Sequence, residues 1–556
     1  MPITSHEESP SSSRVETGEY NKNSAPGYLE RFLPFLIFIF CFAYLIIFRH
    51  YSTLEPDEGI VLQGAERIMA GQIPYRDFFS FYTPGSYYLL AGLFRVFGDS
   101  FAVARISLAV VGAICSVVTY LLARRVCSPG IALFAAVLAT TAGAAFRFLV
   151  LHNPYSTLGC CLCLYATLRL LETQKASCSF AVGSLASLTF LIEQSKGAGL
   201  VLGVALGIVT LRVMDRRFPL RTSALIASAF GVFWPLAVTF GYFGAHHVTN
   251  LMVQSWLWPL HHYTQANHVP YGYQNWSDQS RDAIFHQGPV WLRAIKIFIV
   301  LPNLLLPVLP LIAVGLLGYW IVRLRGGSRI SSGTAYYIVM CSVLSGLLVS
   351  VVNVRADILH FMYLAPLWYV VLAWILGAQG VRSELLNAIR VPLVAFTAAS
   401  FGLLSMAVLF AATGARNHVE TRKGVIATGS SETAIDYIQS RVAPNGQLTI
   451  YPYLPLYNYL TDTRSPSRFD YFQPGMNTPQ QAREIIGSLV GSKAPVLFEP
   501  SFAEKIANSW PGTPIQAVVN DTVAEFIARN YRICQILRSP EGWRFQFMVK
   551  REMPCL

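Results

Sequence analysis

Three carboxylates that lie within four residues are the feature of this sequence best suited to chemistry. Glu55, Asp57 and Glu58 directly follow an apolar run of membrane length, and Pro56 restricts the backbone between them. Ionisable groups are costly at a membrane boundary, so a cluster there favours a functional site. A carboxylate at the outer end of a helix could take a proton from a hydroxyl group or hold a metal ion. The alternative is a solvated loop acid.

The polar character continues beyond these carboxylates. Arg76 and Asp77 lie in the polar stretch 71–78, and both are candidates for binding a substrate. The apolar run 87–97 that follows is too short to span a bilayer, and its aromatic residues predict a helix lying in the outer interface.

Two further groups of charged residues lie at helix ends. Lys196 follows Glu193 where one apolar run ends and the next begins. It could bind a phosphate group as a point charge, or reach the interface as an anchor, which is the commoner role. Arg355, Asp357 and His360 lie at another outer helix end. Arg355 is a second candidate for binding phosphate, with Asp357 and His360 as candidates for binding a substrate; the alternative is an Arg355–Asp357 pair that closes a loop.

Histidines mark two more outer loops. His152 and Asn153 in a short loop are candidates for binding a substrate. A long loop holds His246, His247, His261, His262, His268 and His286, interleaved with Trp and Tyr. Clustered histidines suggest a metal, but the spacing of metal ligands is not sustained, and such a loop is typical of an interfacial belt whose aromatics could contact sugar or lipid. A divalent metal ion stays open as a cofactor.

Composition predicts a polytopic α-helical membrane protein. Of the 556 residues, 53% are hydrophobic and 13% are charged, about half the charged fraction of an average soluble protein. The net charge is +12, but the basic residues are spread over short loops. Their distribution indicates membrane topology and anionic lipid rather than nucleic acid.

Apolar runs of membrane length predict about eleven transmembrane helices. The expected spans are 32–49, 103–123, 130–147, 155–171, 179–193, 197–213, 223–243, 294–322, 334–352, 361–379 and 391–413. Short basic loops stay cytoplasmic, which places the N-terminus inside and the C-terminus outside. The polar candidates then share the outer side of the membrane.

These spans define the expected organisation of the chain. A disordered cytoplasmic tail over 1–30 precedes a transmembrane domain over 31–413, with a first outer loop at 50–102 and a long outer loop at 244–293. The region 414–556 has the composition of an ordinary soluble α/β domain on the outer side.

Within that region, periodicity predicts specific elements. The expected helices are 434–442, 479–490 and 522–530, and the expected strands are 447–451, 494–499, 531–538 and 543–551, the last two forming a hairpin. Eight cysteines lie in or beside apolar runs as small hydrophobes, and only Cys534 and Cys555 could form a disulfide.

The order of these features resembles the GT-C membrane glycosyltransferases. A first span is followed by the outward Asp57-Glu58 pair, the polar stretch 71–78, Pro84-Gly85, Phe97-Gly98 and Arg105 at the start of the next span. The resemblance is closest to the bacterial aminoarabinose and lipopolysaccharide-core sugar transferases, and more distant to the protein O-mannosyltransferases. It covers roughly the first four hundred residues. Thr83-Pro84 stands where the family often has two prolines.

The resemblance implies an inverting transfer of a sugar from a polyprenyl-phosphate donor to a hydroxyl acceptor, which is a glycan, a lipid or a protein. Asp57 would be the catalytic base with Glu58 beside it, and Lys196 and Arg355 would bind the donor phosphate. Some relatives carry a second acid where this chain has His152 and Asn153, so a two-carboxylate metal site is in doubt. The implied location is the outer face of a bacterial inner membrane. The alternative functions are a non-enzymatic transporter or flippase of lipid-linked glycans, or a scaffold.

Overall fold

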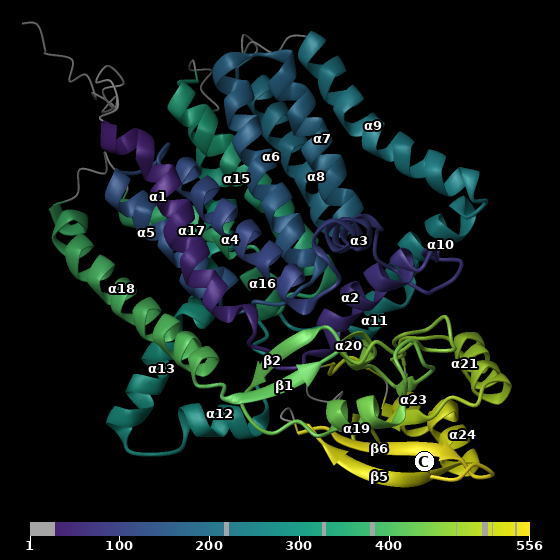
Figure 1. The fold of residues 1–556 in the computed structure, drawn as a ribbon. Helices are drawn as coiled ribbons and strands as arrows, with labels where there is room; N and C mark the ends of the chain where they lie inside the picture. The colour runs from purple at the N-terminus through teal and green to yellow at the C-terminus, as the bar shows by residue number, and fades with distance from the viewer. Residues whose placement is uncertain are drawn as a thin grey trace, which may run out of the picture.

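The computed structural model describes residues 28–215, 222–324, 330–377, 384–473, 475–502, 510–513, 515–539 and 542–555. The predicted tail over 1–30 lies outside these residues, except for the first turn of the first helix. Long helices gather at one end of the molecule, and a small sheet with short helices lies at the other end (Figure 1).

Every range predicted to span the membrane overlaps at least one helix; the range 294–322 overlaps a bent pair, and residues 378–379 of the range 361–379 lie outside the described residues. These helices are α1 (Tyr28–Leu45), α4 (Phe101–Ala123), α5 (Pro129–Leu138), α6 (His152–Thr173), α7 (Ala176–Ile192), α8 (Gln194–Met214), α9 (Thr222–Ala245), α13 (Val290–Leu305), α14 (Val308–Leu324), α15 (Ser332–Val354), α17 (Ala365–Gly377) and α18 (Glu384–Thr413). The structure is therefore mostly helical.

Fewer of these helices meet the requirements for crossing a membrane unaided. Within the described ranges, six helices are long and apolar enough, and the α13–α14 pair, bent by 44°, would be a seventh. Helices α5, α7 and α17 are apolar but shorter. The protein is an integral membrane protein, whereas a count of about eleven crossings stays a prediction.

Small residues allow the membrane helices to pack closely. Helix α8 packs against α15, and α7 packs against α9. A Cβ at Gly203 of α8 would lie 2.5 Å from the Cα of Val343 in α15, and one at Gly346 would lie 2.3 Å from the carbonyl oxygen of Gly199. Close backbone approach through glycine is how helices gain packing energy where lipid removes the hydrophobic driving force.

The predicted first outer loop, residues 50–102, is largely helical. Helix α3 (Gly85–Phe97) confirms the short helix predicted there. Helix α2 (Pro56–Met69) was not predicted, although Pro56 at its first position and two acids in its first turn are typical of a helix start. It packs against α20 (Pro455–Leu460) from the C-terminal region, where a Cβ at Gly59 would lie 1.9 Å from the backbone nitrogen of Leu456.

The long outer loop contains three short helices, and a fourth lies between α15 and α17. They are α10 (Thr249–His261), α11 (Tyr263–Ala266), α12 (Asp278–Phe285) and α16 (Ile358–Tyr363).

The C-terminal region follows α18 and combines helices with strands. A hairpin of β1 (Asn417–Thr421) and β2 (Gly424–Thr428) precedes a four-stranded sheet in the order β3-β4-β6-β5, in which β3 and β4 are parallel and the other pairs antiparallel. The strands are β3 (Thr449–Tyr451), β4 (Val496–Phe498), β5 (Tyr531–Arg538) and β6 (Arg544–Lys550), and the helices are α19 (Ala434–Arg441), α20, α21 (Pro479–Gly491), α23 (Ile515–Val519) and α24 (Thr522–Asn530). The three predicted helices and four predicted strands are confirmed.

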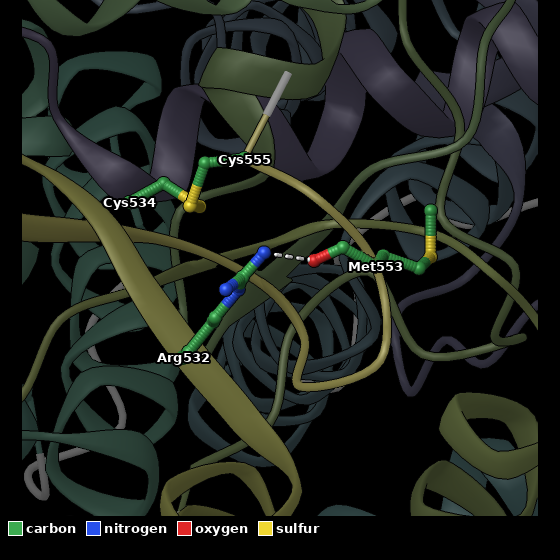
Figure 2. The surroundings of a disulfide bond; sticks show 4 residues. All are labelled: Arg532, Cys534, Met553 and Cys555. Carbon is green, nitrogen blue, oxygen red and sulfur yellow. Dashed lines mark hydrogen bonds between the residues drawn. A yellow bond between two sulfur atoms is a disulfide. The ribbon is translucent and has the colours of Figure 1, made fainter.

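The end of the chain is bonded back to the sheet. Cys534 of β5 forms a disulfide with Cys555 (Figure 2), a pairing that the sequence allows but leaves open. Arg532 donates a hydrogen bond to the carbonyl oxygen of Met553 beside it.

Candidate active site

A cavity of about 1020 Å³ lies between the helix ends of the membrane region and the C-terminal region. Its charged and histidine side chains are Glu55, Asp57, Arg147, His152, Glu193, Arg355, Asp357 and His360. Its apolar side is formed mainly from α8, α10 and α15, by Leu202, Val253, Trp256, Leu257, Leu260, Val349 and Val354. The lining of the cavity therefore combines charged side chains with many apolar ones.

Asp57 lies in the first turn of α2 and faces this cavity. Its carboxylate accepts a hydrogen bond of 2.5 Å from the hydroxyl of Tyr453, which the C-terminal region contributes. Burial raises the pKa of Asp57 above that of an ordinary aspartate, and the bond from Tyr453 partly offsets this rise. A carboxylate with a raised pKa, held by one hydroxyl, is suited to accepting a proton.

Glu58 has different surroundings from its neighbour. Its side chain is fully buried and forms an ion pair of 2.7 Å with Arg105 of α4. Its second oxygen accepts a hydrogen bond of 2.9 Å from the backbone of Val150. Glu58 does not line the cavity, so the structure suits it to holding α2 against α4 rather than to contact with a substrate.

Arg147 lines the cavity beside the carboxylates, and sequence reasoning missed it. It pairs with Glu55 at 2.9 Å and donates to the hydroxyl of Tyr363 at 3.3 Å, while its Nε is buried without a hydrogen-bond partner among the described residues. In the sequence, Arg147 is the last residue of the predicted span 130–147. The available signal was a basic residue at an outer helix end, where the positive-inside rule predicts few.

The structure brings Arg355, Asp357 and His360 together in one network. Arg355 pairs with Asp357 at 2.6 Å, and His360 contacts the other oxygen of Asp357 at 2.7 Å. Burial opposes ionisation of Asp357, but His360 and Arg355 outweigh it and hold its pKa well below the usual range. The Arg355–Asp357 pair that the sequence offers as an alternative is present, and Arg355 also lines the cavity, whereas its binding of phosphate stays a prediction.

Two further side chains fix Arg355 in that network. Asn275 of the long outer loop accepts from Arg355 at 2.8 Å and donates to Asp357 at 2.7 Å. The guanidinium of Arg355 lies 4.6 Å from the ring centre of Trp510. These contacts hold the guanidinium group of Arg355 in one orientation at the cavity wall.

Lys196 is buried behind the cavity wall and does not line it. It pairs with Glu193 at 3.0 Å and donates to Ser156 at 3.1 Å. Glu193 itself faces the cavity. Burial disfavours the charged form of Glu193, but Lys196 and His152 outweigh it and lower the pKa of Glu193 to about 2. The structure thus gives Lys196 a partner within the protein, and direct contact with a phosphate stays a prediction.

The remaining candidates divide between the cavity and the surface. His152 and Asn153 line the cavity, and the His152 ring lies 4.3 Å from that of Tyr82. Arg76 and Asp77 form an exposed pair of 2.8 Å with each other and lie outside the cavity.

The histidines of the long loop do not line the cavity, whereas Trp256, Tyr263 and Trp276 from the same loop do. Across the described ranges, no group of three or more His, Cys, Asp and Glu side chains is placed to hold a metal ion. The belt interpretation and its aromatic contacts stay predictions.

Comparisons with known proteins agree with the resemblance seen in the sequence. Residues 82–242 match the family model described as dolichyl-phosphate-mannose-protein mannosyltransferase. This segment runs from Tyr82 in the cavity to α9 and includes Arg147, His152 and Glu193, but not Asp57. No curated protein matches the chain in sequence.

A comparison with solved structures returned weak matches to ArnT and to an oligosaccharyltransferase. ArnT from Cupriavidus metallidurans, solved bound to undecaprenyl phosphate, has a TM-score of 0.48 and 12% identity, covering 93% of this chain and 97% of its own. The oligosaccharyltransferase AglB from Archaeoglobus fulgidus, solved with an inhibitory peptide and a dolichol-phosphate, has a TM-score of 0.48 and 11% identity, covering 95% and 75%.

Proposed function

We propose that this protein is an inverting glycosyltransferase that moves a sugar from a polyprenyl-phosphate donor to a hydroxyl acceptor. The observation that carries the proposal is the cavity itself, whose lining combines the carboxylate of Asp57 with the cationic side chains of Arg147 and Arg355 and with many apolar side chains. The matched family, named for transfer from a lipid phosphate, supports the choice of donor.

The cavity suggests how the donor binds. The apolar side chains of α8, α10 and α15 contact the lipid tail, and Arg147 and Arg355 bind the phosphate at the charged end. A guanidinium suits this role because it offers several donors to phosphate oxygens in a fixed plane. Lys196 acts through Glu193 rather than on the donor.

The reaction then needs one proton transfer and one displacement. The acceptor hydroxyl gives its proton to Asp57 as its oxygen forms a bond to the anomeric carbon. The bond from that carbon to the phosphate oxygen breaks, and its electron pair leaves with the phosphate. The positive charges of Arg147 and Arg355 stabilise the charge that develops there, so the leaving group needs no proton.

We place the cavity and the C-terminal region on the outer face of a bacterial inner membrane, with a glycan, lipid or protein as acceptor. The Cys534–Cys555 disulfide supports this side, because disulfides persist outside the reducing cytosol. The predicted basic loops support it independently.

The test is sugar transfer by the purified full-length protein in proteoliposomes supplied with polyprenyl-phosphate sugars and candidate acceptors. Asp57→Asn keeps the shape of the side chain and removes the base, so transfer should fall by roughly 10²-fold to 10⁴-fold. Asp436→Asn, on the exposed face of α19, is the matched control. Unchanged transfer by Asp57→Asn at normal expression would overturn the assignment of the base. Lipid translocation without transfer would favour a flippase.

A further inference from the structure

His360 has a ring nitrogen at the active-site cavity for which the proposed transfer reaction gives no role. The residue lies in α16, and its side chain lines the cavity. Its Nδ1 lies 2.7 Å from Oδ1 of Asp357, and its backbone nitrogen donates to the same oxygen at 3.0 Å. The imidazole ring is therefore held in one orientation by Asp357.

Asp357 also determines which nitrogen of the ring carries a proton. The other oxygen of its carboxylate accepts from Arg355 at 2.6 Å and from Asn275 at 2.7 Å. An ionised carboxylate only accepts hydrogen bonds, so Nδ1 of His360 is the donor in their contact. Neutral His360 consequently presents Nε2 as an acceptor, and this nitrogen becomes a positively charged donor when it takes up a proton.

Nε2 lies on the edge of the ring that faces away from Asp357, and this edge is accessible. The side chain of His360 is 20% exposed, and its Nε2 is not buried and makes no hydrogen bond with any described residue. Because the side chain lines the cavity, Nε2 is open to a ligand there. Asp57 of α2 and His152 of α6 lie within electrostatic range of the ring.

The charges of the described residues at the cavity do not add up to a positive surplus. Both guanidinium groups of its lining, from Arg147 and Arg355, already have a carboxylate partner. The ion pairs at the wall are Arg147–Glu55, Arg355–Asp357 and Lys196–Glu193. Asp57 adds a carboxylate that forms no ion pair within the described ranges. A phosphate that enters therefore needs a further positive charge to offset its own.

We propose that His360 is a third phosphate-binding residue, which takes up a proton from solvent when the donor phosphate enters and donates it from Nε2 in a hydrogen bond to a phosphate oxygen. The identity of this ligand rests on the proposed function. A charged donor binds phosphate more strongly than a neutral one, so protonation strengthens binding. The proton returns to solvent when the phosphate leaves.

The test measures the protons taken up on binding, without any transfer reaction. Methyl farnesyl phosphate is, like the proposed donor, a phosphodiester, whose single charge does not change near neutral pH. It is titrated calorimetrically into the full-length protein in nanodiscs, in buffers of different ionisation enthalpy, with empty nanodiscs as the blank. The wild type should take up protons at pH 7, and its affinity should fall roughly tenfold from pH 6 to pH 8.

Three variants assign the proton to one side chain. His360→Gln keeps a neutral donor and cannot take up a proton, so it should bind roughly tenfold more weakly at pH 6 and with no change up to pH 8. His360→Lys is charged at both pH values and should bind without proton uptake. His268→Gln, at an exposed position outside the cavity, is the matched control and should resemble the wild type.

The other outcomes separate this proposal from the proposed function. Proton uptake that persists in His360→Gln would overturn the proposal, and its loss in Asp57→Asn would then assign the proton to Asp57. Binding by the wild type without proton uptake would also overturn it, and would leave the lipid-phosphate donor unaffected. The absence of any binding by the wild type would contradict both this role of His360 and the proposed donor.

Discussion

The hydroxyl of Tyr453 donates a hydrogen bond of 2.5 Å to the carboxylate of Asp57, across a separation of 396 residues. The membrane region supplies the carboxylate, and the C-terminal region supplies the group that holds it. The candidate base is therefore completed only when the two regions are in contact. This arrangement makes the ionisation of Asp57 sensitive to a residue far from the first outer loop.

Tyr453→Phe should shift the pH profile of transfer. A hydrogen bond donated to a carboxylate favours its charged form, so its removal raises the pKa of Asp57 further above the ordinary value. A base must be deprotonated to act, and the acid limb of the kcat/KM profile should consequently move to higher pH. Tyr471→Phe is the control, since the ring of Tyr471 contacts that of Tyr453 at 5.7 Å. An identical profile for Tyr453→Phe and the wild type would contradict the role of Asp57 as base.

Arg147→Gln should reduce kcat/KM for transfer by roughly 10²-fold, because it removes a charge that faces the leaving phosphate. Arg147→Lys should recover part of the loss, since it keeps the charge but not the planar donor set. Arg483→Gln, on the exposed face of α21, is the control. If both Arg147 variants transfer sugar normally, the phosphate does not bind at this end of the cavity.

Glu193→Gln should destabilise the protein by about 3–5 kcal/mol, because it leaves Lys196 buried without its charged partner. The pKa of Glu193 is lowered to about 2. The ionised Glu193 therefore stabilises the fold fully above its unfolded-state pKa near 4.5, which includes pH 7. This stabilisation is lost as the pH falls through about 2. Thermal unfolding in detergent at pH 7 measures the effect.

Two comparisons complete this experiment. The Glu193→Gln, Lys196→Met double variant should lose less stability than the two single variants add up to. Glu525→Gln, which breaks an exposed pair with Arg529, should change stability by less than about 1 kcal/mol. Normal stability of Lys196→Met combined with loss of transfer would instead support direct binding of the donor phosphate by Lys196.

Cys534→Ser should expose Cys555 to reagents added outside intact cells. In the wild type both sulfurs are bonded, and of the other cysteines all but the half-buried Cys178 are buried. A membrane-impermeant maleimide should label the variant and leave the wild type unlabelled. Labelling of the variant only after the membrane is permeabilised would place the C-terminal region on the cytoplasmic side.

Patterns that are local in sequence predicted most of the helices and strands. The hairpin of β5 and β6 and the helix α24 follow the expected ranges closely because alternation and periodicity report on one buried face at a time. Helix α2 was missed because its polar composition resembles a loop, although Pro56 and the acids after it are a usual start signal.

The candidate site was predicted less completely, for a different physical reason. The sequence singles out Asp57, His152 and Arg355, which line the cavity, because charged and polar residues at helix ends are unusual in an apolar chain. The partners of Arg147 and the burial of Lys196 depend on how helices rotate and on contacts between residues far apart. A sequence position places a lysine at a helix end but does not show which way its side chain points.

Gly59 restricts how α2 can pack against the C-terminal region. It lies two residues after Asp57, and its backbone touches that of Leu456 with no room for a methyl group. A larger side chain at this position would force the two backbones apart, so Gly59→Ala should displace the helix that carries Asp57 from the C-terminal region.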